Sequence, residues 1–238
     1  MTQSRNVVLR VAGLLVAVVA IAVGAVVLTD GEGDDRSQRS DRQTTTTSLT
    51  TTSTGVGLES SAVWPVASSD TRYDEPGAAA RGFAAEYVGF GTPLVGEFRQ
   101  GDARSGEIDV RATDAGPVTT VLVRQLGPDD SWWVIGAGTP NIQVNEPTGL
   151  ARVSSPVTLD GISTAFEATV QVEVREDGKA EPLGEGFVMG GANGELGPFH
   201  STLEFSDPST VFGTIFFFTT SAEDGHIVEA TVIRVQFV

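Results

Sequence analysis

The chain has 238 residues, no cysteine and a formal net charge of −16 at pH 7. The absence of cysteine excludes disulfides, and it excludes any metal site or nucleophile that is built on a thiolate. The strong acidity disfavours nucleic acid and anionic lipid headgroups as partners, because like charges repel.

Residues 11–28 form an uncharged run of Val, Ala, Gly, Leu and Ile, directly after a segment that carries Arg5 and Arg10. As a helix with a rise of about 1.5 Å per residue, this run would measure roughly 27 Å, close to the roughly 30 Å hydrocarbon core of a bilayer. Acidic residues follow at once within 30–35. We therefore expect a transmembrane helix at 11–28, with residues 1–10 cytoplasmic and the remainder extracytoplasmic.

A cleaved signal peptide is the alternative to a retained anchor in the cell membrane. Small residues within Ala20–Gly24 suit a cleavage site. However, the apolar run continues past them and exceeds the roughly 7–15 residues that are usual for a signal peptide. The sequence therefore favours a single-pass anchor and leaves cleavage open.

Residues 29–61 are predicted to be a disordered linker. They begin with several acids and become rich in Thr and Ser between Thr44 and Thr54. Such a stretch buries too little apolar surface to offset the entropy of ordering the chain. Its expected role is to span the distance between the bilayer and the folded part.

Residues 62–140 are predicted to form a small α+β module. Asp74-Glu75-Pro76 has the acids and the proline that are typical of a helix start. Ala79, Phe83 and Tyr87 then share one face of the expected helix. Glycines and a proline within 89–93 end it. Alternation and turn residues predict strands over 107–111, 118–125 and 132–137, with a turn at 126–130.

Residues 141–238 are predicted to be all β. Side chains over 166–175 alternate between apolar and polar, and Asp177-Gly178 suits a tight hairpin turn. The closing strand changes phase between Val232 and Ile233, which predicts a bulge there. Short strands with frequent turns over roughly 100 residues indicate a β-sandwich. Further predicted features are a strand over 199–205 and a hairpin at Asp224-Gly225.

Several turn residues and one alternating strand make the second module resemble a known family. They are Ser155-Pro156, Gly161, Phe166 to Val170, Gly191, Gly197-Pro198-Phe199 and Asp224-Gly225. In their order and spacing, residues 141–238 resemble the immunoglobulin-like domain of bacterial spore-germination proteins, which is often attached to GerM-N modules. The resemblance implies an immunoglobulin-like sandwich in an envelope protein, and it implies no catalytic residues.

The residues that most often carry chemistry are sparse and scattered. His200 and His226 are the only histidines, and both are predicted to lie on the surface. Gly184-x-Gly186 and Gly190-Gly191 are predicted to be turns, because no helix follows them to form a phosphate site. We therefore predict a non-enzyme without catalytic residues, without cofactor-binding residues and without a metal site.

Two bulky apolar motifs must point side chains to both faces of their strands. The first is Trp132-Trp133 and the second is Ile215 to Phe218. Only one face of a two-layer sandwich is inside, so alternate residues need a second cover. The first module, another copy of the chain and a ligand are the candidate covers. Packing inside the chain is favoured for the two tryptophans. Trp132, Trp133, Phe216 and Phe218 are the candidate interface residues if their exposed faces are covered from outside the chain.

These features together predict a mainly β, non-catalytic binding or scaffolding protein of the bacterial cell envelope. Its expected contacts are the membrane, through the N-terminal helix, and an unidentified envelope protein or polymer, with nucleic acid excluded. The first alternative is a structural subunit that self-associates into a homo-oligomer. The second alternative is a hydrolase of envelope material.

Overall fold

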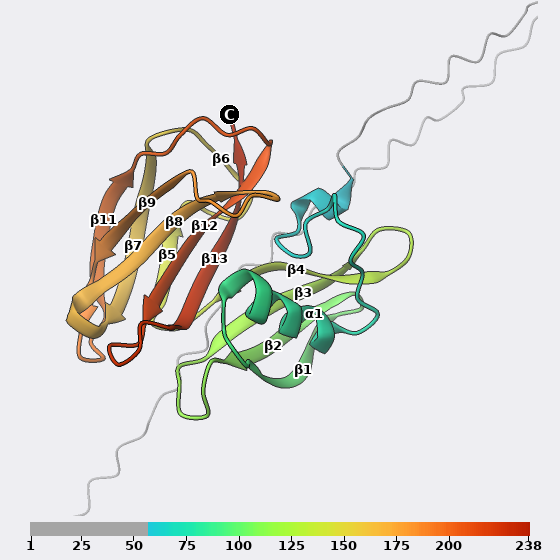
Figure 1. Cartoon of the computed structure of the whole chain (residues 1–238), viewed down its shortest axis with the longest axis horizontal. Helices are drawn as coiled ribbons and strands as arrows, with labels where there is room; N and C mark the ends of the chain where they lie inside the picture. The colour runs from blue at the N-terminus through green and yellow to red at the C-terminus, as the bar shows by residue number, and fades with distance from the viewer. Residues whose placement is uncertain (1–56) are drawn as a thin grey trace, which may run out of the picture. The chain divides into compact units, whose positions relative to one another are not determined.

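Strands dominate residues 57–238, which are the part of the chain that the computed structural model describes (Figure 1). The predicted transmembrane helix at 11–28 and all but the last residues of the predicted linker lie outside the described residues. Within residues 57–238, no helix combines the length and the apolar character needed to cross a membrane.

The described residues belong to one compact unit with two sheets. The helices are η1 (Leu58–Ser61), α1 (Pro76–Gly82), η2 (Phe83–Val88) and η3 (Phe166–Ala168). The strands are β1 (Leu94–Asp102), β2 (Ser105–Arg111), β3 (Thr119–Leu126), β4 (Ser131–Gly138), β5 (Ile142–Glu146), β6 (Ala151–Val153), β7 (Val157–Ala165), β8 (Thr169–Glu176), β9 (Gly184–Met189), β10 (Gly191–Ala192), β11 (Gly197–Leu203), β12 (Phe212–Thr220) and β13 (Ile227–Phe237).

The larger sheet has nine strands in the order β1-β2-β3-β4-β13-β12-β8-β9, with β6 paired to β13. The smaller sheet has four strands in the order β10-β7-β11, with β5 paired to β7. Almost all pairings are antiparallel, and the exceptions are β6 on β13 and β10 on β7. The prediction of a mainly β protein is therefore confirmed.

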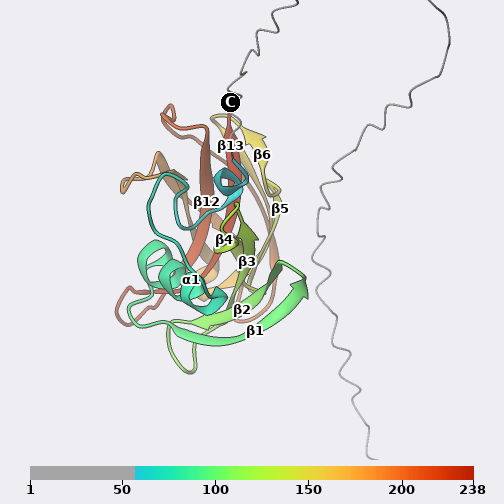
Figure 2. The ribbon, with the colours of Figure 1, turned by 90° about the vertical axis from the view of Figure 1, so that its right-hand side faces the viewer.

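The predicted helix is present and begins where the proline places it. Pro76 is the first residue of α1, where a missing amide hydrogen costs no hydrogen bond. The helix continues as the π-helical segment η2 and ends at Gly89, whose φ of 93° favours glycine. Ala79 and Phe83 on its inner face are fully buried. Figures 1 and 2 show α1 against strands β1 to β4.

The strand pattern of residues 107–137 is confirmed, whereas the strand before it has no counterpart in the prediction. Strands β2, β3 and β4 and the turn after Leu126 lie where alternation and turn residues predict them. Strand β1 is exposed at almost every residue, and its register on β2 shifts between Val95 and Phe98. The sequence of β1 therefore lacks the alternation that marks a half-buried strand.

The sandwich over residues 142–237 has a core between the two sheets. Val172, Val174 and Phe217 of the larger sheet meet Leu159 and Phe199 of the smaller one, and all five are buried. The alternation predicted from residue 169 onwards is confirmed. The prediction was wrong for Phe166–Ala168, which form the turn η3, because positive φ angles at Glu167 and Ala168 break the extended backbone.

Two turn predictions in this part were wrong. Asp177-Gly178 does not close a tight hairpin, because residues 177–183 all lie between β8 and β9. Gly184 and Gly186 lie inside β9 and not in a turn. A Cβ at Gly184 would lie 2.5 Å from the carbonyl oxygen of Glu204, so glycine is needed there for the close approach of the backbones.

Strands β12 and β13 form a wall with a core on each face. Phe216 and Phe218 face the core that α1 and η2 cover, whereas Ile215 and Phe217 face the sandwich core. The predicted bulge between Val232 and Ile233 was wrong, because both residues pair with β12 in regular register. The change of phase arises because Val232 packs into the first core and Ile233 packs against the second.

A row of polar residues closes one end of the first core. Arg234, Thr214 and Arg175 lie side by side across β13, β12 and β8. The guanidinium carbon of Arg175 lies 4.0 Å from the centroid of the Phe216 ring, and its Nη1 donates a hydrogen bond to the Tyr87 carbonyl at 2.9 Å. This arginine therefore ties the end of η2 to the sandwich through a hydrogen bond and a cation–π contact.

Arg234 is buried at the same end and forms a salt bridge with Asp177. It also donates a hydrogen bond to the Ser60 carbonyl at 2.6 Å. The Tyr87 hydroxyl is hydrogen-bonded to Thr214, and burial of the phenol raises the pKa of Tyr87. Arg234 therefore joins η1 to the loop after β8, and the neighbouring Thr214 holds η2.

A second polar cluster lies at the predicted module boundary near residue 140. The buried Glu229 carboxylate accepts hydrogen bonds from Thr139 Oγ1 at 2.7 Å, Asn141 Nδ2 at 2.9 Å and Thr219 Oγ1 at 3.0 Å. The connection between β4 and β5 is therefore fastened to the β12–β13 wall, because a buried carboxylate needs such partners.

Replacing Phe216 with alanine is expected to lower the free energy of unfolding by about 3–5 kcal/mol, since the ring is fully buried between helix and sheet. Urea denaturation followed by tryptophan fluorescence measures the change. The matched control is Phe187→Ala, because Phe187 is 62% exposed. We expect it to change stability by less than about 0.5 kcal/mol. Equal losses in the two variants would contradict the shared core.

Candidate binding surface

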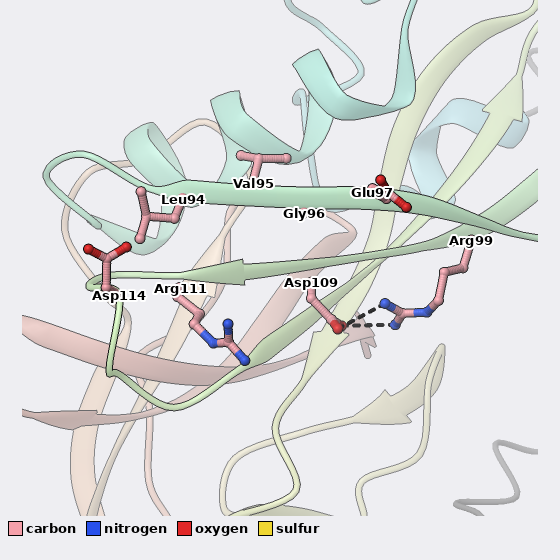
Figure 3. Close-up of a pocket in the computed structure, with 8 residues that line it drawn as sticks. All are labelled: Leu94, Val95, Gly96, Glu97, Arg99, Asp109, Arg111 and Asp114. Atoms are coloured by element: carbon pink, nitrogen blue, oxygen red, sulfur yellow. Dashed lines mark hydrogen bonds and ion pairs between the residues drawn. The ribbon is translucent and has the colours of Figure 1, made fainter.

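A groove of about 450 Å³ follows the edge strand β1 (Figure 3). Its walls come from β1, from the neighbouring strand β2 and from the residues that follow β2. The lining residues are Leu94, Val95, Gly96, Glu97, Arg99, Asp109, Arg111 and Asp114.

The bulge in β1 positions the apolar part of the groove. Val95 packs against the core beneath α1, while Leu94 is 42% exposed. Gly96 lies where a Cβ would come within 3.1 Å of the Asp109 carbonyl oxygen. A Cβ there would make a tight contact, so glycine suits the close approach of β1 to β2 at the irregular register.

One end of the groove is closed by a bidentate ion pair. Arg99 Nη1 and Nη2 each lie 2.8 Å from an oxygen of Asp109, and Thr120 Oγ1 donates a further hydrogen bond to Asp109 at 2.8 Å. Arg99 Nη2 also contacts Glu107 at 3.4 Å. The hydrogen bonds from Arg99 lower the pKa of Asp109, and Thr120 adds to this effect. Asp109 is therefore a poor proton donor at neutral pH.

Three further charged side chains belong to the groove. Within residues 57–238, Glu97, Arg111 and Asp114 have no ion-pair partner. In the view of Figure 3, Leu94 and Asp114 lie at one end of the groove and Arg111 lies between them and the Arg99–Asp109 pair. An apolar side chain beside charges of both signs suits the binding of a polar chain with apolar substituents.

The described residues also form a second groove, and both histidines lie at the surface. A second groove, of about 400 Å³, lies between Asn145 and Thr158. His200 Nδ1 lies 3.2 Å from Asp160 Oδ2 on the surface, and His226 is exposed, so their predicted surface positions are confirmed. Among the described residues, no three side chains of His, Asp or Glu gather as metal ligands would.

The four candidate interface residues lie mainly inside the chain. Trp133, Phe216 and Phe218 are 1%, 0% and 6% exposed. Trp132 is half-buried, and its ring lies 5.3 Å from that of Phe98 in an edge-to-face arrangement. Packing inside the chain, which the sequence favours for the tryptophans, therefore describes Trp133, Phe216 and Phe218. None of the four residues lines the groove.

The residues of the groove were missed by sequence reasoning, although one signal was present. Glu107, Asp109 and Arg111 alternate with buried residues in β2, so their side chains share the face away from α1. Three charges on one face of a strand could have marked a polar surface. The contribution of β1 could not be predicted, because the bulge breaks the alternation of apolar and polar residues by which a strand is recognised in a sequence.

The comparisons with known proteins concern the sandwich. Residues 141–226 match the model of a family described as the immunoglobulin-like domain of bacterial spore germination. The C-terminal part is immunoglobulin-like. The predicted resemblance is thus confirmed for these residues. No curated protein and no solved structure matches the chain. The match ends just before β13, the strand through which the immunoglobulin-like part joins β4.

Replacing Asp109 with asparagine is expected to lower the free energy of unfolding by about 1 kcal/mol at pH 7, because it weakens a half-exposed ion pair. The folded-state pKa of Asp109 is lowered, so its carboxylate stabilises the fold above the unfolded-state pKa of about 3.9. This contribution is lost as the pH falls through the lower folded-state value. Urea denaturation at several pH values should therefore show a constant difference above about pH 5 that shrinks below about pH 4.

Asp114→Asn is the matched control in the same groove, and we expect it to change stability by less than about 0.5 kcal/mol. A difference between wild type and Asp109→Asn that stays constant down to pH 2 would argue against the role of the Arg99–Asp109 pair.

Proposed function

We propose that the chain is a membrane-anchored, extracytoplasmic and non-catalytic binding or scaffolding protein of the bacterial cell envelope. The N-terminal apolar run would hold it in the membrane, and the linker would carry the β-rich part away from the bilayer. The match of residues 141–226 to a domain of bacterial spore germination supports an envelope setting.

The groove along β1 is the observation that carries the binding role. It combines an exposed strand edge, the exposed Leu94 and the charge of Arg111, which has no ion-pair partner within the described residues. An edge strand offers backbone hydrogen-bond donors and acceptors to another chain, and neighbouring side chains then select which chain binds. We therefore propose an extended segment of an envelope protein or polymer as the occupant of this groove.

The same edge supports the alternative of a structural subunit that self-associates. A second copy could pair with β1 as well as another protein could. The net charge of −16 opposes such pairing, because a second copy would carry the same charge. We therefore place recognition of a different molecule ahead of self-association.

Photo-crosslinking in intact cells tests the binding role and separates it from the alternative. A photoreactive residue in place of Leu94 is expected to give a discrete adduct of higher mass, since Leu94 lies in the groove. The matched position is Val211, which is 52% exposed and lies outside the groove. Adducts of twice the monomer mass would favour self-association. Equal adducts at the two positions, or none at Leu94, would contradict the proposal.

The anchor is tested by extraction of membranes at high pH. We expect the full chain to stay with the membrane pellet and a variant that lacks residues 1–28 to appear in the soluble fraction, because the apolar run is long enough to span the bilayer. An epitope tag at the N-terminus reports cleavage. Loss of this tag from a soluble mature chain would replace the anchor with a signal peptide.

A further inference from the structure

The segment before α1, residues 58–73, takes the place of a strand along part of β4. Strand β13 pairs with β4 at a single position, Val232 with Ala137, and further on it pairs with β6. The side of β4 away from β3 is therefore left, over residues 131–135, to this segment, which we call the strap. Apart from the turn η1 and one bridge at Trp64, the strap contains no helix or strand.

Backbone hydrogen bonds hold the strap against β4. The Val134 amide donates to the Trp64 carbonyl at 2.7 Å, and the Trp132 amide donates to the Tyr73 carbonyl at 2.8 Å. The Val63 amide in turn donates to the Val134 carbonyl at 2.7 Å. The outward amides of β4 are thus satisfied by the strap, and its removal would leave an open strand edge.

The strap also covers a tryptophan of β4. Ala62 of the strap packs with Leu126 and Trp133 in a small core of buried side chains. The guanidinium carbon of Arg72 lies 4.9 Å from the centroid of the Trp133 ring. Val63 belongs to the first core and is 2% exposed. Opening of the strap would therefore expose few apolar side chains, and both sheets could keep their pairing.

Several buried polar atoms at the strap lack hydrogen-bond partners. Among residues 57–238, four buried side-chain nitrogen or oxygen atoms have none, and three of them lie in or against the strap. They are Ser69 Oγ in the strap, Trp133 Nε1 beneath it, and Arg234 Nε in the side chain that binds the Ser60 carbonyl. A buried polar atom without a partner destabilises the closed state, and contact with water relieves this when the strap opens.

We infer that residues 58–73 open as one unit while both sheets stay folded, and that the strap thereby controls access to the edge of β4. Openings of this kind occur in contiguous units, with free energies below that of global unfolding. The open state bares the outward backbone groups of Trp132 and Val134 and the ring of Trp133. The strap is separate from the groove at β1, since no residue that lines the groove belongs to the strap or to β4. Either can therefore fail while the other stands.

Thiol labelling of the full chain in phosphatidylcholine nanodiscs tests the inference, because the chain has no cysteine of its own. Ala62→Cys places a thiol in the strap, where Ala62 is 1% exposed. The matched control is Ala230→Cys in β13, where Ala230 is 0% exposed. We expect Ala62→Cys to react at least roughly tenfold faster, since the strap opens more often than the whole fold. Equal rates, each corrected for the rate in urea, would overturn the inference.

A pair of serine variants tests the role of the unpartnered atoms. Ser69→Ala removes a buried hydroxyl without a partner, so it should slow the labelling of Ala62→Cys at least roughly threefold. Ser61→Ala removes a hydroxyl that donates to the Leu58 carbonyl at 2.6 Å, so it should not slow labelling. No slowing in Ser69→Ala, or equal slowing in both variants, would overturn this role. Circular dichroism confirms that each variant is folded.

Hydrogen exchange of single amides, followed by NMR, tests whether the strap opens as one unit. The amides of Val63, Trp132 and Val134 bond across the contact between strap and β4, and we expect them to share one opening free energy. The Trp133 amide points towards β3, because successive residues of a strand point to opposite neighbours. It should exchange more slowly than the amides on either side of it. Equal protection of the Trp132, Trp133 and Val134 amides would overturn the inference.

Discussion

Strands β12 and β13 must bury both of their faces, and the arrangement of the other elements depends on how this is done. A sandwich with two layers can cover only one face of a strand pair. Phe217 and Val235 are covered by the smaller sheet, which leaves Phe216 and Val232 without a partner unless a further layer is present. The chain supplies this layer itself, through α1, η2 and strands β1 to β4. The immunoglobulin-like part therefore contributes one face of the β12–β13 wall to the first core, which it shares with the part before it, and the other face to the sandwich core.

The way the two parts are joined explains which features were predictable. Helix α1 and strands β2 to β4 follow local rules of capping, alternation and turn chemistry, and they lie where those rules place them. The phase change at Val232–Ile233 was visible in the sequence, but a bulge was the wrong explanation. Local patterns do not reveal that one strand faces two cores, because this depends on contacts between residues far apart in the chain. The need of Phe216 and Phe218 for a second cover was predictable, whereas its supply by the chain was one alternative among three.

The edge strands of the large sheet were harder to predict for a related reason. Alternation identifies strands that are half-buried, and both edges of the large sheet depart from it. In β1 the exposure is nearly complete and the register shifts. In β9 the glycines at 184 and 186 resemble turn residues, although they lie in a strand that approaches β11 closely. Edge strands carry surfaces for recognition because they are incompletely paired, and the same property removes the pattern by which a strand is found in a sequence.

The segment before α1 is fastened to the fold at several points. Val63 and Trp64 exchange backbone hydrogen bonds with Val134, and Ser60 accepts a hydrogen bond from the buried Arg234. A mechanical pull on the N-terminal end of the described chain would therefore load Ser60 and Arg234 first and β4 next. Arg234 belongs to the β12–β13 wall, so the load would pass directly into the most deeply buried strands. Force applied at this end would reach the centre of the fold before it reached either sheet edge.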